Sequence, residues 1–537
     1  MQEGTGKPVF SGVAIGKAYV YDPRQNELPA SCGDSELELE KFNAARETAR
    51  EQLGTLFDKT SSEIGEEQAM ILDVQIMMLD DLDFIESAQD MIAGGASAAQ
   101  AAHDAGDAFS AAFAAMDDEY MKARAVDVKD MSRRLVDILC GGHGGFHMDE
   151  PGILVAEDLT PSETVQLPKD KILAFVTRQG SANSHTAILA RIMNIPTLVQ
   201  TDISISPEIN GKLMIVDGYD GRYYIDPDPA VVSSMVEKLR KAMAYKAELD
   251  KYRGKPSVSK SGKKVLLCAN IGSAQDVRYA LEGDAEGVGL MRSEFLYLGR
   301  DSFPTEEELY QAYRSVAEQL NGRPLVIRTL DIGADKQADY FGLEHEENPA
   351  LGYRGIRICL TREDIFRPQM RAIYRAAVHG PVSAMFPMII SVDEVRQIKE
   401  FCRKIQSELY AENIPFGEVE LGIMIETPAA AIISRDLAKE VSFFSVGTND
   451  LTQYTLAIDR QNARLEAFHD AHHPAILSLL RTIAENAHAE GIWAGICGEL
   501  GADLSLTDAF LEMGYDELSV SPGKILALRK KVCESEA

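Results

Sequence analysis

The stretch LGIMIETPAAAIISRDLAKEVSFFSVGTND, residues 421–450, carries the pattern that decides the fold. One apolar run ends in Glu426, a helix-forming stretch follows, and a second apolar run ends in Asn449 and Asp450. From Lys263 onward this alternation repeats, and we expect eight strands: VLLCANI (265–271), GVGLMRSE (287–294), LVIRTLDI (325–332), GIRICL (355–360), VSAMFPMI (382–389), LGIMIETP (421–428), FFSVGTND (443–450) and WAGICGE (493–499). Because polar residues gather at the C-terminal end of nearly every run, a (β/α)8 barrel is favoured over a doubly wound sheet.

Arginines recur where these strands end: Arg292, Arg328, Arg354, Arg357 and Arg460. The active site of a barrel lies at the C-terminal ends of its strands, so these side chains are expected to converge. Guanidinium groups bind phosphate and carboxylate through two parallel hydrogen bonds. The expected ligand therefore carries both groups.

Three further residues at the strand ends indicate chemistry. Glu426 and Asp450 are hard carboxylates from neighbouring strands, which suits Mg²⁺ completed by water and substrate oxygens. Cys497 lies between Gly495 and Gly498 at the same end of the barrel. Its thiol could donate a proton to carbon or act as a nucleophile, and the residue pattern leaves both roles open.

The N-terminal half has a different organisation. Residues 8–21 resemble a strand pair, and strand-like runs return at 153–159, 172–178 and 213–218. Between them, residues 34–139 contain no proline and show helical spacing of apolar residues, which predicts about four helices inserted into an α/β unit. A charged helix over 230–252 is expected to link this half to the barrel.

His185 has a setting that the other histidines lack. It follows a loop of small residues, GSANSHT (180–186), and is expected in the first turn of a helix that Pro196 stops. The free N–H groups and the positive dipole at a helix start would stabilise a phosphoryl group on the ring. They would also keep the imidazole neutral and nucleophilic.

The composition excludes several classes of protein. The net charge of −30 argues against nucleic acid as a partner, and no apolar run is long enough to cross a membrane. No secretory signal precedes the first strand, and the seven dispersed cysteines indicate reduced cytoplasmic thiols. Residues 34–90 hold 16 acidic and 4 basic residues, which is typical of a solvated helical face.

Together these motifs resemble enzyme I of the bacterial sugar phosphotransferase system, the phosphoenolpyruvate–protein phosphotransferase family. The resemblance extends from about residue 8 to about residue 530. The matching motifs are DDEYMKARAVDVKD (117–130), EDLTPSET (157–164), SHTAILAR (184–191), GLMRSEFLY (289–297), RTLDIGADK (328–336), NPALGYRGIR (348–357), MFPMI (385–389), GIMIETPAA (422–430), SVGTNDLTQYTLAIDR (445–460) and GICGEL (495–500).

The resemblance implies a role for each candidate residue. His185 would be phosphorylated, with Thr164 beside it, and Cys497 would protonate the enolate of pyruvate. The positions that bind phosphoenolpyruvate would be Arg292, Arg328, Arg354, Asn449, Asp450 and Arg460. Glu426 and Asp450 would hold Mg²⁺.

The resemblance also implies the architecture and the partners. A swivelling α/β phosphohistidine domain (1–33 and 142–229) would carry a helical insertion (34–141) that binds the phosphocarrier protein HPr. A linker helix (230–258) would lead to a C-terminal (β/α)8 TIM-type barrel (259–537) that forms a homodimer. The protein would be a cytoplasmic transferase acting at the first step of sugar uptake.

Five features depart from the family pattern: Ser181, Asn183, Ala334, Gln75 in place of a histidine, and a chain end at Ala537 soon after the expected eighth strand. The early chain end is expected to weaken barrel closure and the dimer.

Two other functions are less consistent with the sequence. A pyruvate–phosphate dikinase relative would need an ATP-binding domain before the histidine domain, where only about 140 residues of mostly helical sequence lie. A non-catalytic regulator would have no need for Arg292, Glu426, Asp450, His185 and Cys497 together.

Overall fold

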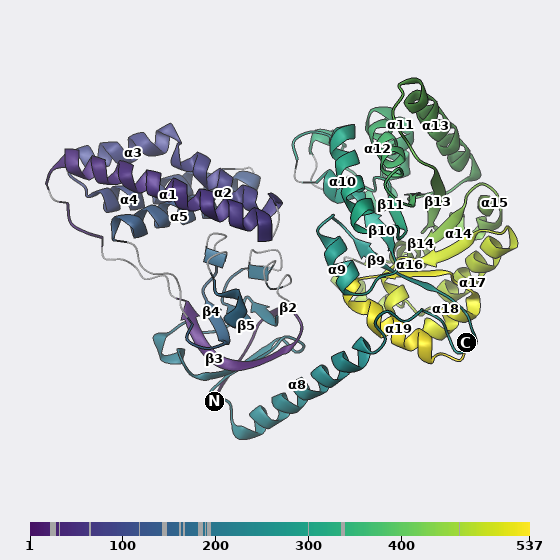
Figure 1. Ribbon diagram of the computed structural model, residues 1–537, viewed down its shortest axis with the longest axis horizontal. Helices are drawn as coiled ribbons and strands as arrows, with labels where there is room; N and C mark the ends of the chain where they lie inside the picture. Colours follow the sequence, from purple (N-terminus) through teal and green to yellow (C-terminus); the bar gives the residue numbers. More distant parts are fainter. Residues whose placement is uncertain are drawn as a thin grey trace. The chain divides into compact units, whose positions relative to one another are not determined.

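The structure is a computed structural model. It describes residues 1–21, 28–31, 33–63, 66–116, 119–141, 148–159, 163–164, 167–180, 186–187, 190, 195–298, 300–333, 339–460 and 462–537. The chain forms two compact units, Met1–Tyr245 and Lys246–Ala537 (Figure 1). In the part of the chain that is described, no helix is both long enough and apolar enough to span a membrane.

The first unit contains an eight-stranded sheet of order β1-β8-β7-β3-β4-β5-β6-β2. Its strands are β1 (Gln2–Thr5), β2 (Lys7–Phe10), β3 (Val13–Tyr21), β4 (Gly152–Ala156), β5 (Ile172–Thr177), β6 (Thr197–Val199), β7 (Leu213–Asp217) and β8 (Arg222–Ile225). β3 pairs in parallel with β4, although about 130 residues of sequence separate them. The segment between them is therefore inserted into the sheet topology, as predicted.

That insertion is a bundle whose described helices are α1 (Ser35–Glu63), α2 (Glu66–Leu79), α3 (Leu82–Ala93), α4 (Ala98–Ala114) and α5 (Glu119–Leu139). These are five helices where about four were expected. Phe42, Ala45, Ala49 and Leu53 recur at three- and four-residue spacing on α1, and all four are buried in the bundle core. On α1 the helical spacing therefore predicted the core correctly, whereas Met70 and Leu82, which share such spacing further along the bundle, are exposed.

A long helix, α8 (Pro229–Asp250), leaves the sheet and leads into the second unit. Val231, Val232, Met235 and Leu239 on its first half pack against Val13, Ile215 and Tyr224 of the sheet. This apolar stripe anchors the start of the helix, because its residues lie on one face at helical spacing.

The second unit is a closed barrel of eight parallel strands, ringed by helices (Figure 1). Its strands are β9 (Leu266–Ile271), β10 (Val288–Arg292), β11 (Leu325–Arg328), β12 (Val382–Phe386), β13 (Val419–Ile425), β14 (Phe443–Val446), β15 (Trp493–Ile496) and β16 (Glu517–Val520). Its described helices are α9 (Asp276–Glu282), α10 (Glu306–Gln319), α11 (Ile356–Thr361), α12 (Glu363–Ala376), α13 (Val392–Ala411), α14 (Pro428–Ile432), α15 (Ser434–Ala438), α16 (Thr448–Leu456), α17 (Pro474–Ala489), α18 (Thr507–Met513) and α19 (Ile525–Glu534).

Side chains alternate between the two faces of each barrel strand. Ile423 and Ile425 of β13 belong to the core shared with the surrounding helices, whereas Met424 belongs to a separate cluster inside the barrel. The interior cluster consists of Leu290, Val326, Met385, Met424, Phe443 and Cys497, with Trp493 stacked on Phe443.

The barrel prediction is confirmed, but one of its eight strands was wrong. The GIRICL segment forms helix α11, and its Gly355 has a positive φ of 59° that bends the chain into the helix. The missing strand is β16, which pairs with both β15 and β9 and so closes the barrel. The expectation that the chain end at Ala537 weakens barrel closure is therefore wrong.

Candidate active site at the mouth of the barrel

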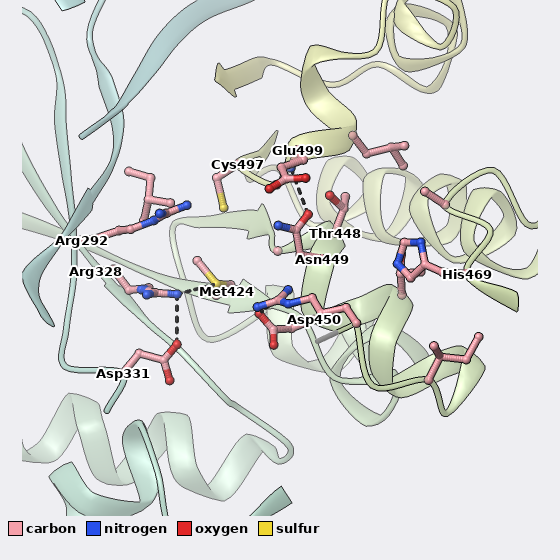
Figure 2. A pocket seen from close by; sticks show the side chains of 18 of the residues that line it. Arg292, Arg328, Asp331, Met424, Thr448, Asn449, Asp450, His469, Cys497 and Glu499 are labelled. Atoms are coloured by element: carbon pink, nitrogen blue, oxygen red, sulfur yellow. Dashed lines mark hydrogen bonds and ion pairs between the residues drawn. The ribbon is translucent and has the colours of Figure 1, made fainter. Parts of the chain in front are cut away.

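The C-terminal ends of the barrel strands surround a cavity of about 1240 Å³. Among the residues predicted from sequence, the following line it: Arg292, Arg328, Arg354, Asn449, Asp450, Arg460 and Cys497. Figure 2 shows Arg292 and Arg328 entering from one side and Asn449 and Asp450 from the other. The structure thus brings together side chains from strands that are up to 200 residues apart in sequence.

Two half-buried arginines of the cavity, Arg328 and Arg354, are held by carboxylates. Arg328 donates to Glu294 Oε1 at 2.6 Å, and its Nη1 lies 3.0 Å from Asp331 Oδ2. Arg354 donates from Nη2 to both oxygens of Asp331, at 2.8 and 2.9 Å. Burial acts to lower the pKa of Arg328, but the charges of Glu294 and Asp331 outweigh burial and raise it. Both guanidinium groups are therefore charged and fixed in orientation.

Sequence reasoning assigned no role to Glu294 and Asp331. A signal was available, because each carboxylate lies two or three residues after a strand-end arginine, in RSE and RTLD. Burial raises the pKa of Glu294, against the opposing charge of Arg328. These acids position the arginines, and an anionic ligand must compete with them.

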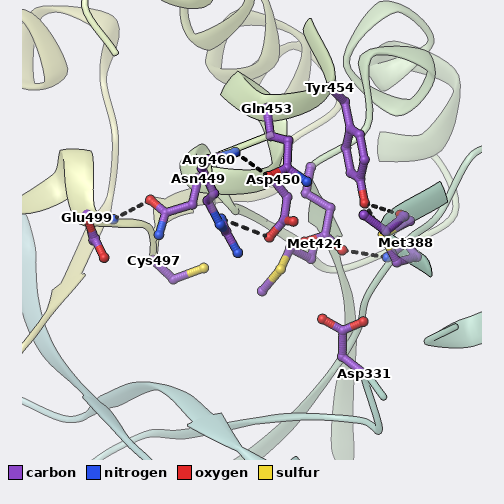
Figure 3. A network of polar contacts seen from close by, with 12 residues as sticks. Asp331, Met388, Met424, Asn449, Asp450, Gln453, Tyr454, Arg460, Cys497 and Glu499 are labelled. Atoms are coloured by element: carbon purple, nitrogen blue, oxygen red, sulfur yellow. Dashed lines mark hydrogen bonds and ion pairs between the residues drawn. The ribbon is translucent and has the colours of Figure 1, made fainter. Parts of the chain in front are cut away.

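Helix α16 and the loop after it supply the opposite wall (Figure 3). Asn449 and Asp450 lie in the first turn of α16, and Asn449 Oδ1 accepts a hydrogen bond from Glu499 N at 3.1 Å. Arg460 Nη1 lies 3.6 Å from Asp450 Oδ2, while the Arg460 backbone N–H donates to Gln453 Oε1 at 3.3 Å. The loop after β15 and the start of α16 are thus joined by a direct hydrogen bond.

Glu426 is fully buried behind the cavity lining and accepts a hydrogen bond from Met388 N at 2.6 Å. Burial, followed by the nearby charges of Asp331 and Asp450, raises the pKa of Glu426 to about 8. Its Oε2 and Asp450 Oδ1 are buried and have no hydrogen-bond partner among the described residues.

These two unpartnered oxygens, Glu426 Oε2 and Asp450 Oδ1, indicate where a metal ion would fit. Buried carboxylate oxygens without partners are costly, and a hard divalent cation would satisfy both. Within the described residues, no group of three or more His, Cys, Asp or Glu side chains could hold a metal by itself. The donor set therefore fits a cation that takes its other oxygens from water and substrate.

Cys497 follows β15 directly and is buried, with its Sγ 3.6 Å from Val446 O. Burial raises the pKa of its thiol to about 11, against opposing effects of Ser445 and Arg328. A thiol with this pKa stays protonated at neutral pH and supplies very little nucleophilic thiolate. Of the two roles left open by the sequence, the structure favours the acid.

The residues predicted for phosphoryl transfer in the first unit are only partly described. His185, Ser181 and Asn183 lie outside the described residues, as does Ala334 in the barrel. Thr164 is described and buried. Gln75, at the position where the family has a histidine, is buried in the bundle and donates to Asp130 Oδ2 at 2.8 Å.

Three family models match the chain, described as the N-terminal (residues 5–124), mobile (148–221) and PEP-binding (246–537) domains of PEP-utilising enzymes. The chain is 41% identical over 533 residues to the phosphoenolpyruvate-protein phosphotransferase of Staphylococcus carnosus (strain TM300), covering 98% of this chain and 93% of the relative. The protein of the same name from Bacillus subtilis (strain 168) is 40% identical over 537 residues, with coverages of 99% and 94%. A solution structure of Enzyme I (nEIt) is 30% identical over 45% of this chain and 99% of its own, with a TM-score of 0.38.

Proposed function

The chain belongs to the phosphoenolpyruvate-protein phosphotransferase family, and from this membership we propose that it moves the phosphoryl group of phosphoenolpyruvate to its own His185 and then to HPr, releasing pyruvate. This would be the first step of sugar uptake by the phosphotransferase system, in the cytoplasm. The observation that carries the proposal is that arginines, orphaned carboxylate oxygens and a protonated thiol meet at one barrel mouth.

Substrate binding would use the guanidinium groups. Phosphoenolpyruvate carries a phosphate and a carboxylate, and Arg292, Arg328 and Arg460 surround the cavity from different strands and loops. Bidentate hydrogen bonds from fixed guanidinium groups would set the orientation of both anionic groups. Arg354 would assist through Asp331, which it shares with Arg328. Asn449 lies on the same wall and would add a neutral donor.

Glu426 and Asp450 are the residues that would hold Mg²⁺. When bound, the ion would neutralise phosphate charge and act as a Lewis acid. The orphaned oxygens of both side chains support this assignment.

Phosphoryl transfer needs His185 to reach the cavity in line with the phosphate. The transition state of such transfers is loose, so positioning and charge neutralisation supply most of the rate. We propose that the α/β domain, residues 1–33 and 142–229, swivels on the linker at 230–258 to deliver His185, with Thr164 close to it. The remaining segments would be the HPr-binding insertion, 34–141, and the barrel, 259–537.

Cys497 would complete the reaction in the barrel. After the phosphoryl group has left, the enolate of pyruvate needs a proton at C3, and the Cys497 thiol lines the cavity. Protonation at carbon gives the stable keto form and makes transfer from phosphoenolpyruvate favourable. The high pKa of the thiol supports this role because the proton is present at neutral pH.

The helical bundle would be the docking surface for HPr. Its acidic excess between residues 34 and 90 would complement a positively charged partner. We further propose a homodimer through the barrel, as the family resemblance implies.

The test is incubation with phosphoenolpyruvate labelled at phosphorus, in the presence of Mg²⁺. We expect an acid-labile label on the wild-type chain and none on His185→Ala. Label that also comes from ATP would overturn the proposal in favour of a dikinase. A wild-type chain that takes no label from either donor would point to a non-catalytic regulator.

A further inference from the structure

The inside of the barrel directly below Cys497 contains a buried acid that the proposed reaction does not use. Gly495 of β15 pairs in register with Ser445 of β14 on one side and with Glu517 of β16 on the other. Cys497 lies two residues further along the same face of the chain, roughly 6.6 Å above Gly495 by the rise of a strand. Since Gly495 has no side chain, none from β15 separates Ser445 from Glu517.

Glu517 is almost completely enclosed. Glu517 is only 3% exposed, and its Oε1 accepts no hydrogen bond from any described residue. A Cβ at Gly289 would lie 2.3 Å from this oxygen, and one at Gly495 would lie 3.3 Å from it. The two glycines therefore make the room that the carboxyl group occupies.

Ser445 faces the same space. It is 1% exposed, and its hydroxyl interacts with the Cys497 thiol but has no other hydrogen-bond partner among the described residues. The Ser445 hydroxyl and the Glu517 carboxyl therefore lie in one row below the thiol that lines the cavity, and Glu517 Oε1 is buried there without a partner, which is costly.

We propose that Glu517 is a proton reserve for Cys497, and that Ser445 relays the proton between them. The inference rests on the proposed function. When the thiol gives its proton to C3 of the enolate, the products are pyruvate and a Cys497 thiolate. The thiolate then takes the Ser445 hydroxyl proton while that oxygen takes the proton of the Glu517 carboxylic acid, which leaves Glu517 as a carboxylate. Solvent water reloads Glu517 by the same path after pyruvate has left the cavity.

The direction of this transfer agrees with the acidities of the two groups. Burial raises the pKa of Glu517 to about 7, against a hydrogen bond from Cys268, whereas the pKa of Cys497 is about 11. The other polar or titratable groups near the Glu517 carboxyl are Asp516, Ser519, Cys268 and Cys497, and Ser445 lies in register with Glu517 across Gly495. A thiolate in contact with pyruvate can remove the proton it has just delivered, but a reprotonated thiol cannot. The reserve would therefore make the protonation step one-way.

The experiment is rapid-quench measurement of pyruvate, with phosphoenolpyruvate, Mg²⁺ and an excess of HPr as acceptor. For the isosteric variant Glu517→Gln we expect a normal burst of one pyruvate per chain, followed by a steady-state rate about 10- to 100-fold below that of the wild type. Ser445→Ala should give the same two phases. Glu517→Asp should recover part of the steady-state rate, because it restores an acid.

Controls separate this role from a structural one. Glu420→Gln removes an exposed acid from neighbouring β13 and should behave like the wild type. Thermal melting of each variant checks the fold. A Glu517→Gln time course without a burst, or one identical to the wild type, would overturn the proton reserve. If the wild type itself forms no pyruvate, it is the proposed function that fails.

Discussion

Gly498 offers the sharpest test of how the active-site wall is built. It follows Cys497, and its backbone angles of −81° and 171° are open to any residue, so an alanine there meets no backbone strain. However, the added Cβ would lie 2.0 Å from Thr448 Oγ1 and 2.6 Å from Thr448 N. The second contact is with backbone at the start of α16, which no side-chain rotation can relieve.

The size of the expected effect follows from these distances. An ordinary contact of this kind begins at 3.4 Å, so the loop after β15 and the start of α16 must separate by roughly 0.8 Å. Cys497 and Asn449 lie on the two sides of that contact. A displacement near 1 Å in an active site costs about 100-fold in rate, whereas overpacking costs about 1–3 kcal/mol of stability. We therefore expect Gly498→Ala to lose about 100-fold in rate, equivalent to about 2.7 kcal/mol, while a stability loss of about 1–3 kcal/mol leaves the chain folded under assay conditions.

The assay is the initial rate of pyruvate formation from phosphoenolpyruvate, paired with urea unfolding. Gly523→Ala is the matched control, because a Cβ at Gly523 meets nothing within 4 Å. Adding Thr448→Ala to Gly498→Ala should not restore activity, since the backbone contact remains. A Gly498→Ala rate within threefold of the wild type would refute the reasoning.

Three further predictions concern charge. In metal-free protein the pKa of Glu426 is about 8 in the folded state and near 4.5 in the unfolded state, so the folded state binds the proton more tightly. The free energy of unfolding of the wild type should therefore fall by up to roughly 5 kcal/mol as the pH rises from 4.5 to 8. Urea midpoints of Glu426→Gln should lack this pH dependence, and an equal dependence would contradict the assignment. Asp331→Asn should destabilise the chain by about 3–5 kcal/mol, because Arg328 and Arg354 lose a shared carboxylate. Phosphoenolpyruvate should raise the melting temperature of Asp331→Asn less than that of the wild type, because Arg328 and Arg354 are no longer held in orientation; an equal or larger rise would count against this. The rate at which iodoacetamide alkylates Cys497, followed by mass spectrometry, should rise about tenfold per pH unit up to pH 11, because only the thiolate reacts. A plateau near pH 8 would contradict the raised pKa of this thiol.

The sequence predicted the barrel well because its strands are apolar runs with polar ends. It was wrong where an apolar run was too short to distinguish a helix from a strand. The GIRICL segment has the composition of a strand, yet it forms α11 after a glycine with positive φ. β16 was not predicted because its sequence, ELSV, is short and is not an apolar run: its glutamate and serine face the barrel interior.

The candidate site shows a similar division. Residues that line the cavity could be predicted, because arginines and carboxylates at strand ends have few other reasons to gather there. Glu294 and Asp331 follow strand-end arginines in the sequence, but only the three-dimensional pairing reveals which arginine each acid holds: Glu294 contacts Arg328, and Asp331 contacts both Arg328 and Arg354. The position of Glu517 below Cys497 could not be predicted for the same reason, because it depends on the register of three neighbouring strands, which the sequence of one strand does not contain.

The charges around the mouth explain how an acidic protein can bind a polyanion. Four arginines line the cavity, Arg292, Arg328, Arg354 and Arg460, together with six acidic residues, Glu294, Asp331, Asp450, Asp459, Glu499 and Asp503. Fully ionised, this lining has no net positive charge, so net attraction cannot be what selects phosphate. Selection must then come from geometry, because the carboxylates hold the planar guanidinium groups in orientations in which they can donate hydrogen bonds to the ligand. The acids that compete with the ligand are therefore also the groups that prepare its donors, and removing one of them weakens the site even though it makes the mouth more positive.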